Sequence, residues 1–323
     1  MKHQHHTSKP SIGVLIPYFN ERGLLTDCLN SLAAQSDPPD EVIIYDDASS
    51  EPPGKYIPAG FPARVLKGKE NRGPAFGRNR LLETARSQYI HFHDADDWFH
   101  RAWCERLRKI IANDPVDAVF TGVSWTAGSE PSFQGDVVGL GDFSEGTDLV
   151  QFCINHYVLS PVGTFLRERV LAIGGYREAL WQAEDYEFHM RLAASGITFK
   201  IFPEPLVCIR ARPDSRSQKR IDVWSGALMG LELMAGELPA TYCQDIAEAL
   251  VDVGLQLYRL GEKTAARRAF KLARLCGTPH FHKTPWHFRT VARLFGPEFA
   301  EKVGQVYRRL PAKMRRISRF EKR

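Results

Sequence analysis

The stretch from Tyr89 to Trp98 reads Tyr-Ile-His-Phe-His-Asp-Ala-Asp-Asp-Trp. Its aromatic and β-branched first half is typical of a buried strand. A strand interior would not tolerate the carboxylates of Asp94, Asp96 and Asp97, so we place them just beyond the strand's carboxyl end. Carboxylates this close repel one another unless a cation neutralises them, and their oxygen atoms suit Mg²⁺ or Mn²⁺. The structural alternative is an acidic turn that caps a helix beginning near Trp98.

Acidic residues follow a second apolar run earlier in the chain. Residues 12–17 and 41–45 are typical of strands buried on both faces, and the second run leads directly into Asp46 and Asp47. Helical periodicity at 21–35 and 75–87 alternates with these runs, which predicts an α/β domain with a mainly parallel sheet. In such sheets ligands bind beyond the carboxyl ends of the strands. The polar side chains expected to converge there are Asn20, Asp46, Asp47, Asp94 and Asp96.

The later part of the chain changes character near residue 214. Before it we expect a helix at 102–113, a strand at 118–125, a helix from Trp181 to Gly196 and a strand at 198–201. Asp185 falls in the first turn of the helix from Trp181, where favourable interaction with the helix dipole is its plain structural role. After residue 214, helical periodicity dominates, with a helix pair at 244–259 and 263–275.

Composition excludes several classes of protein. The 323 residues are 43% hydrophobic and 25% charged, with a net charge of +5, and no run is apolar enough for a membrane span or a signal peptide. We therefore expect a cytoplasmic protein with reduced cysteines. His3, His5 and His6 are interpreted as part of a flexible tail or an expression-tag remnant, whose native origin the sequence leaves open.

Basic character is concentrated at the C-terminus. Lys302 to Arg323 contains nine Lys or Arg residues against Glu321 alone, so the rest of the chain is acidic and no nucleic-acid partner is expected. Apolar residues lie among these cations. Two interpretations stay open: peripheral association with an anionic membrane, at its inner face, or a solvated tail.

Six short motifs in this order resemble the family 2 glycosyltransferases of GT-A fold. They are 14–21, 42–49, Asn71-Arg72-Gly73 with Arg78-Asn79, 93–97, Gly174-Gly175-Tyr176 and Glu184-Asp185. The resemblance covers roughly residues 10–210, and it implies a Rossmann-like GT-A domain at 11–213. The flexible tail at 1–10, an α-helical region at 214–300 and the basic tail at 301–323 lie outside the implied domain.

The resemblance implies a nucleotide sugar donor, with UDP first and TDP or GDP as alternatives. Its nucleotide would contact Pro17, Tyr18, Asn20, Glu21, Asp46, Asp47, Arg78 and Asp94. An ionised carboxylate accepts hydrogen bonds only, so Asp47, or else Asp46, suits the N–H group of a uracil base. The structural alternatives are strand ends and turns for the acids, and a surface arginine for Arg78.

The same resemblance implies a divalent metal and a base. Asp96, with Asp94, would hold Mn²⁺ or Mg²⁺ against the diphosphate, and Asp97 would support them, for example as a helix cap. Asp185 would be the general base of an inverting transfer to a saccharide or lipid-linked acceptor. Glu184 would support Asp185, and Trp181 would stack on an acceptor sugar.

Other functions fit the sequence less well. A dinucleotide dehydrogenase needs G-x-G-x-x-G and a P-loop enzyme needs G-x-x-x-x-G-K-[ST], and neither motif occurs. A sugar nucleotidyltransferase is expected to carry a glycine- and arginine-rich loop near its start. A catalytically inactive nucleotide-sugar-binding or scaffold protein remains the alternative from a different class, although Asp94, Asp96 and Asp185 are intact.

Overall fold

The computed structural model describes residues 9–134, 146–281 and 284–309. It divides into two compact units, one through Gln218 and one from Lys219. The His-rich start, residues 135–145 and residues 310–323 of the basic tail lie outside the described residues.

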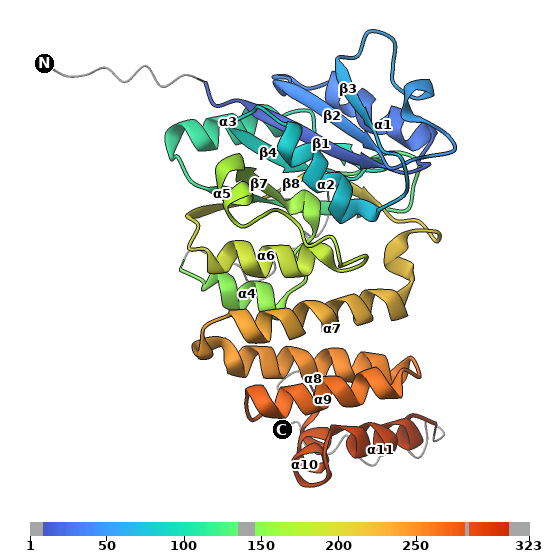
Figure 1. Cartoon of the computed structure of the whole chain (residues 1–323), viewed down its shortest axis with the longest axis vertical. Coiled ribbons are helices and arrows are strands. Elements are labelled where there is room, and N and C mark those ends of the chain that lie inside the picture. The colour runs from blue at the N-terminus through green and yellow to red at the C-terminus, as the bar shows by residue number, and fades with distance from the viewer. Residues whose placement is uncertain (1–8, 135–145, 282–283, 310–323) are drawn as a thin grey trace, which may run out of the picture. The chain divides into compact units, whose positions relative to one another are not determined.

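The first unit alternates strands and helices (Figure 1). Its strands are β1 Ile12–Tyr18, β2 Glu41–Asp46, β3 Ala63–Lys67, β4 Tyr89–Phe92, β5 Trp98–Phe99, β6 Ala118–Thr126, β7 Gly163–Leu166 and β8 Phe199–Arg210. Its helices are α1 Gly23–Ala33, α2 Gly73–Thr84, α3 Trp103–Asn113, α4 Leu149–Asn155, α5 Arg167–Ala172 and α6 Glu184–Ala194, with short 3₁₀ turns at Pro53–Lys55, Ser160–Val162 and Arg216–Gln218.

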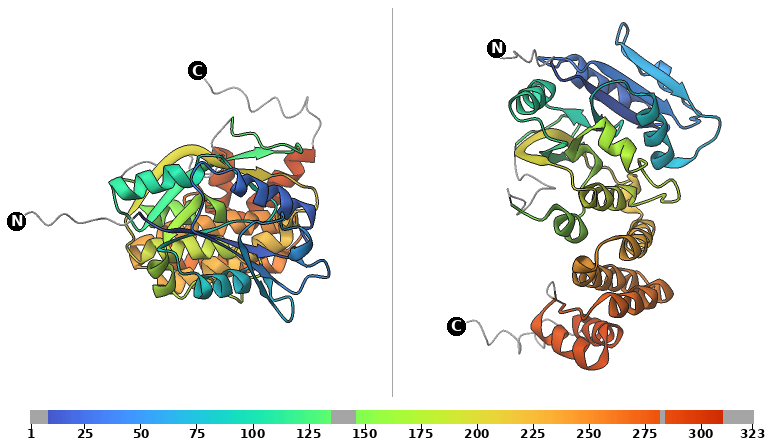
Figure 2. Two further views of the ribbon diagram at one scale, coloured as in Figure 1. Left: turned by 90° about the horizontal axis from the view of Figure 1, so that it is seen from above. Right: turned by 60° about the vertical axis from the view of Figure 1, so that its left-hand side comes forward.

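The strands form one mixed sheet in the order β3-β2-β1-β4-β7-β6-β8-β5. Within the described residues, the pairs β1–β2, β1–β4, β2–β3 and β6–β8 are parallel, whereas β7 is antiparallel to both β4 and β6, and β5 is antiparallel to β8. The N-terminal strands, drawn in blue, lie side by side in Figure 2. The α/β fold with a mainly parallel sheet is confirmed.

The strands near the middle of the sheet are buried because helices pack on them. β1 is fully buried from Ile12 to Ile16, and all four residues of β4 are buried. α2 lies against β1 and β2, and Gly77 permits the close approach, because an added Cβ would lie 3.0 Å from the ring of Tyr45. Because these strands are buried on both faces, they appear in the sequence as continuous apolar runs.

Two expectations at the far side of the sheet were wrong. Trp98 does not begin a helix: β5 pairs with β8, Trp98 beside Cys208, and α3 begins at Trp103. The last strand does not end at Ile201 but continues to Arg210. Pro205 lacks an N–H group, yet the strand continues because the register with β6 shifts at Gly122, opposite this proline.

The second unit is helical. Its helices are α7 Arg220–Glu237, α8 Cys243–Arg259, α9 Lys263–Cys276, α10 Trp286–Phe295 and α11 Pro297–Arg309, with a 3₁₀ turn at Ala240–Tyr242. α8 and α9 form the expected antiparallel pair, in which Gly254 lets the Phe270 ring approach the backbone of α8. None of the helices in the described ranges combines the length and the apolar character that crossing a bilayer requires.

Candidate functional site

The polar residues that follow β1, β2 and β4 share one edge of the sheet. Pro17 lies beside Tyr45 and Tyr18 beside Asp46, so the parallel strands β1 and β2 end together. The N–H group of His93, at the end of β4, donates to the carbonyl of Leu15 in β1. Asp46 is the last residue of β2, and the loops that begin there carry Asn20, Glu21, Asp47, Asp94, Asp96 and Asp97. The structure therefore brings these side chains to a common edge.

Asp47 organises the loop before α2. Its two carboxylate oxygens accept hydrogen bonds from the backbone N–H groups of Arg72 at 3.0 Å and Gly73 at 2.8 Å. Gly73 has φ 83°, a backbone conformation that favours glycine, and an added Cβ would press on the ring of Trp181 at 3.2 Å. Burial raises the pKa of Asp47. Each oxygen has a second lone pair, so the carboxylate can still accept a donor from a ligand.

Asp46, Tyr18 and Asn20 tie the first two loops together. Asp46 is buried, and its Oδ1 accepts the N–H group of Ser49 at 2.9 Å. Asn20, at φ 59°, accepts the N–H group of Glu51 at 3.0 Å through its side-chain oxygen. The Tyr18 hydroxyl donates to the Glu51 carbonyl at 2.7 Å. These bonds hold the loops after β1 and β2 to each other. Contacts between these residues and a ligand stay predictions.

Arg78 is a buried bridge rather than a surface arginine. Its side chain is 4% exposed, and its Nη1 donates to Glu184 Oε1 at 2.7 Å while its Nη2 donates to Asp94 Oδ1 at 2.9 Å. The guanidinium thus pairs with two carboxylates, and its contact with the nucleotide stays a prediction. This pairing connects the acidic stretch after β4 with the start of α6.

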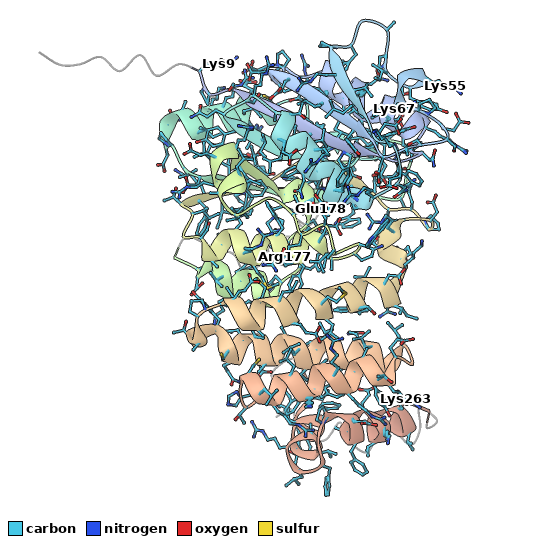
Figure 3. The ribbon with its side chains drawn as sticks, in the orientation of Figure 1. Lys9, Lys55, Lys67, Arg177, Glu178 and Lys263 are labelled. Atoms are coloured by element: carbon cyan, nitrogen blue, oxygen red, sulfur yellow. The ribbon has the colours of Figure 1, made fainter. Side chains whose placement is uncertain are left out.

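The Gly174-Gly175-Tyr176 motif fastens the loop before α6 to α2. Asn79 accepts the N–H group of Tyr176 at 2.8 Å and donates to its carbonyl at 2.9 Å. Gly175 has φ 68°, and an added Cβ would collide with Asn79 Oδ1. Glu178, labelled in Figure 3, accepts from Asn79 at 3.2 Å and pairs with Arg72 at 3.2 Å. The motif therefore positions α6.

Asp96, Glu21 and Arg212 form a second ionic cluster. Arg212 Nη2 lies 2.8 Å from Asp96 Oδ2 and 3.0 Å from Glu21 Oε2. Burial, and then the charge of Asp94, raise the pKa of Asp96 to about 6. Burial, and then the charge of Asp96, raise the pKa of Glu21 to about 7. Three carboxylates thus share a negative field that one arginine only partly offsets.

Asp97 does not cap a helix. Its Oδ1 accepts the N–H group of Arg210 at 2.9 Å, and burial raises its pKa well above the usual range. The Arg210 guanidinium lies 3.7 Å over the Trp98 ring and pairs with Asp27 at 2.7 Å. Asp97 therefore ties the acidic stretch to the end of β8, which supports the site but not in the way we expected.

Asp94 and Asp96 can hold a divalent cation only if another molecule supplies further ligands. Among the described residues, no group of three or more His, Cys, Asp or Glu side chains is arranged to hold a metal ion. Asp94 and Asp96 each bind an arginine through one oxygen and have a second oxygen. Hard oxygen donors suit Mg²⁺ and Mn²⁺, which keep several positions for water and phosphate. Two carboxylates on one loop, each with a second oxygen, therefore fit a cation whose other ligands come from a diphosphate.

Asp185 lies in a different electrostatic setting. Burial, and then the neighbouring Glu184, raise the pKa of Asp185 to about 7. Its Oδ1 accepts the Tyr157 hydroxyl at 2.6 Å and its own helix's Tyr186 N–H group at 3.0 Å. The Tyr157 ring stacks on the Tyr186 ring at 5.5 Å. A carboxylate held in this way is oriented and close to half-ionised at neutral pH.

Trp181 lies before α6, not in it. The helix begins at Glu184, after Ala183 takes a left-handed conformation, so the expected start at Trp181 was three residues too early. The Trp181 side chain is 57% exposed, and its backbone carbonyl accepts from Arg216. An exposed indole one turn before Asp185 can offer a flat apolar surface to a ligand.

Sequence reasoning missed Arg210, Arg212 and Tyr157. The two arginines were not identified because the last strand was expected to end at Ile201. The apolar run Leu206-Val207-Cys208-Ile209 was the available signal that the strand continues to the same edge. For Tyr157 no local pattern indicates its partner, because α4 and α6 meet only in the folded chain.

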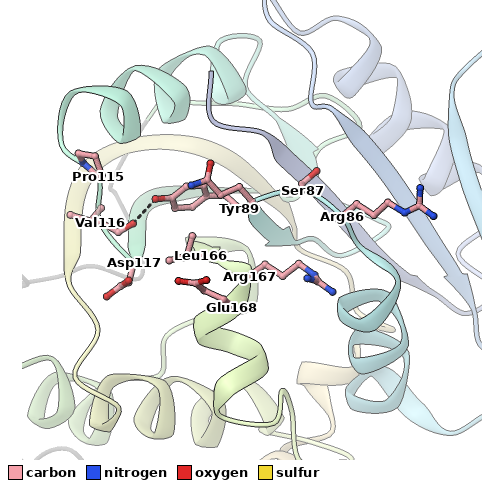
Figure 4. Close-up of a pocket in the computed structure, with 10 residues that line it drawn as sticks. Arg86, Ser87, Tyr89, Pro115, Val116, Asp117, Leu166, Arg167 and Glu168 are labelled. Carbon is pink, nitrogen blue, oxygen red and sulfur yellow. Dashed lines mark hydrogen bonds between the residues drawn. The ribbon is translucent and has the colours of Figure 1, made fainter. Parts of the chain in front are cut away.

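Two hollows lie outside this cluster. A pocket of about 440 Å³, shown in Figure 4, is lined by residues that include Tyr89, Asp117 and Glu168, and the Tyr89 hydroxyl donates to the Val116 carbonyl at 2.8 Å. Tyr89 is the first residue of β4, so this pocket lies at the opposite edge of the sheet. A second hollow of about 380 Å³ is lined by Lys67 and Arg72, among others, beside the ends of β2 and β3.

Comparison with known proteins identifies relatives. Residues 13–168 match the family model described as glycosyl transferase family 2. An uncharacterized glycosyltransferase of Haemophilus influenzae is 26% identical over 188 residues, which is 56% of this chain and 61% of the relative. Across the first three relatives the matched stretches span 35% to 61% of their length, so the chain covers about half of them.

Solved structures share the fold. S. aureus TarS 1-349 in complex with UDP-GlcNAc superposes with a TM-score of 0.70 at 18% identity, over 92% of this chain and 91% of that one. The mannosyltransferase PcManGT of Pyrobaculum calidifontis, in complex with GDP-Man and Mn²⁺, gives 0.58 at 17% identity, over 94% and 89%. At these identities the likeness concerns the fold alone.

Proposed function

We propose that this chain, whose residues 13–168 match the model of glycosyl transferase family 2, transfers a sugar from a nucleoside diphosphate sugar to an acceptor hydroxyl group. UDP is the expected nucleotide, and a saccharide or lipid-linked saccharide is the expected acceptor. The acceptor oxygen forms a bond to the anomeric carbon while the bond from that carbon to the diphosphate breaks. The electron pair leaves with the diphosphate, Asp185 takes the acceptor proton, and one displacement inverts the configuration.

The observation that carries this proposal is the Arg78 bridge. One buried guanidinium holds Asp94, on the donor side, and Glu184, the neighbour of Asp185. A displacement of this kind needs the leaving group and the base on opposite sides of one carbon at a fixed separation. A shared arginine in the protein interior supports such a fixed separation.

The setting of Asp185 supports its assignment as the base. A general base works best when its pKa lies near the working pH, and burial brings the pKa of Asp185 to about 7. Tyr157 holds one carboxylate oxygen, Oδ1, which leaves Oδ2 to face an acceptor hydroxyl group. In this proposal the exposed Trp181 ring stacks on the acceptor sugar.

On the donor side, Asp47 would accept the base N–H group, and Pro17, Tyr18, Asn20 and Asp46 would shape that pocket. A divalent cation, Mn²⁺ or Mg²⁺, held by Asp96 and Asp94 would neutralise the charge of the departing diphosphate. Glu21 adds to the negative field at this point, and Arg212 pairs with Asp96 in the ligand-free chain. The complexes of TarS with UDP-GlcNAc and of PcManGT with GDP-Man and Mn²⁺ support the class of donor and metal.

The test is Asp185→Asn, assayed by sugar transfer or by slow hydrolysis of a panel of UDP-, TDP- and GDP-sugars with Mn²⁺. We expect turnover to fall by about 10²- to 10⁴-fold, the usual contribution of general acid–base catalysis, while calorimetric UDP binding is unchanged. Asp222→Asn is the matched control, because Asp222 also lies in a first helical turn, that of α7. Binding without turnover in the wild-type protein would favour the scaffold alternative.

The location of the protein is part of the proposal. We infer that it works in the cytoplasm, and that the basic segment Lys302–Arg323 attracts it to the anionic inner face of a membrane. Residues 310–323 of that segment lie outside the described residues, so the support is its charge alone.

A further inference from the structure

Helices α10 and α11 turn an apolar face outwards, and we propose that this face docks on an anionic lipid surface. We call it the outer face and define it by Phe295, Phe299, Val303 and Val306. Their side chains are 66%, 47%, 44% and 63% exposed. Single exposed apolar residues are common on proteins, but a continuous group of this kind marks an interaction site.

The outer face is continuous because of helical spacing. Phe299, Val303 and Val306 recur at intervals of four and three residues, which places them in one stripe along α11. The Phe295 ring, at the end of α10, lies 5.3 Å from the Phe299 ring and extends the stripe. From Phe299 to Val306 the stripe runs about 10 Å along α11.

The opposite face of α11 forms ion pairs with α8 and α9 of the same unit. Glu301 is completely buried and receives two hydrogen bonds from Arg259 of α8, at 3.1 Å and 2.9 Å. Glu298 pairs in the same two-pronged way with Arg267 of α9, at 3.0 Å and 2.9 Å. An amphipathic helix usually buries its apolar stripe and exposes its charges. In α11 this arrangement is reversed, so the apolar stripe stays available to a partner.

Charge indicates an anionic lipid surface as that partner. Lys302 lies beside the stripe with its side chain 58% exposed, and Arg293 is exposed on α10. Eight Lys or Arg residues and one Glu follow Val306 in the sequence. Apolar residues with a border of cations are the pattern of helices that lie in the plane of an anionic membrane, where each cation near the surface adds attraction.

A second copy of the chain fits the outer face less well. In a two-fold symmetric dimer the same face would meet itself, and the exposed cations Lys302 and Arg293 would approach their own copies. Like charges brought together in this way oppose association. The same cations favour anionic lipid, which is why we commit to the membrane.

The test is flotation of the full chain with vesicles of phosphatidylcholine alone, or of phosphatidylcholine and phosphatidylglycerol in a three-to-one ratio. We expect binding to the anionic vesicles only. The double variant Phe299→Ser, Val303→Ser should bind them about tenfold more weakly or worse, because it removes two apolar side chains that would leave water. A tail variant, Lys313→Gln, Arg315→Gln, Arg316→Gln, should weaken binding separately and make it less sensitive to salt.

The matched control is Leu171→Ser, Ile221→Ser, whose side chains are 38% and 43% exposed elsewhere in the chain. Circular dichroism of both double variants checks that the helices persist. Equal flotation of the outer-face variant and the control would overturn the proposal. So would sedimentation showing a wild-type dimer that the outer-face variant dissociates, with no vesicle binding by either protein. No readout involves sugar transfer, so the result is independent of the catalytic proposal.

Discussion

The two acidic clusters of the first unit, around Asp96 and around Asp185, are neutralised in different ways. Around Asp96 the partner is a cation, because Arg212 pairs with both Asp96 and Glu21. Around Asp185 the direct side-chain partner is the neutral hydroxyl of Tyr157. Arg78 stands between the clusters and pairs with one acid from each side. The clusters therefore present different charges to a ligand.

The two kinds of neutralisation suit two different chemical steps, the binding of a cation and the transfer of a proton. Carboxylates that already pair with arginines can exchange those partners for another cation, which suits the binding of a metal and a diphosphate. A carboxylate held by a neutral donor, with its pKa raised to about 7, can gain and lose a proton near neutral pH. In the proposed mechanism the Asp96 cluster would bind the metal ion and the Asp185 cluster would transfer the proton.

The largest expected effect comes from Asp96→Ala, which removes a carboxylate that we propose as a metal ligand. We expect Mn²⁺-dependent UDP binding to weaken by about a hundredfold or more, since changes even in the outer shell of a metal site cost 10- to 100-fold. Calorimetric titration with and without EDTA measures this. Asp27→Ala is the control, because Asp27 pairs with Arg210 but lies outside the acidic stretch. Unchanged, EDTA-insensitive affinity in Asp96→Ala would remove the metal assignment.

Arg78→Ala should break the connection between the clusters. It leaves Glu184, which is 8% exposed, without its buried partner, and it frees Asp94. Breaking a buried ion pair costs 3–5 kcal/mol, and because Asp94 is partly exposed we expect about 3 kcal/mol of unfolding free energy, measured in urea. Arg80→Ala, on the exposed side of α2, should cost less than about 1 kcal/mol. Equal losses in the two variants would show that Arg78 is no bridge.

The smallest effect is expected from Tyr157→Phe. Activity of the wild-type protein should rise as the pH passes through about 7, because Asp185 must lose its proton to act as a base. The Tyr157 hydroxyl lowers the pKa of Asp185, so removing it should raise that pKa and move the rise in kcat to higher pH. A pH profile of kcat measures the shift. An unmoved profile would mean that Tyr157 does not act on the base.

Local sequence patterns predicted the strand ends that carry the site, because a buried strand appears in the sequence as an apolar run. The apolar runs at 12–17 and 41–45 and the stretch from Tyr89 each ended in polar residues where the structure ends a strand. A helix was wrongly expected to begin near Trp98. The strand that contains Trp98 is only two residues long and pairs with β8, which comes much later in the sequence. For the same reason the end of β8, with Arg210 and Arg212, escaped prediction.

By itself the sequence determined that Asp46, Asp47, Asp94 and Asp96 stand at strand ends, because carboxylates cannot follow the strand into the core. It also placed Asp185 in the first turn of a helix. Only the tertiary structure decided which arginine neutralises which acid. The chain has 43 Lys and Arg residues, and any arginine can pair with any carboxylate. The choice of Arg78 and Arg212 follows from where α2 lies and where β8 ends in the folded chain.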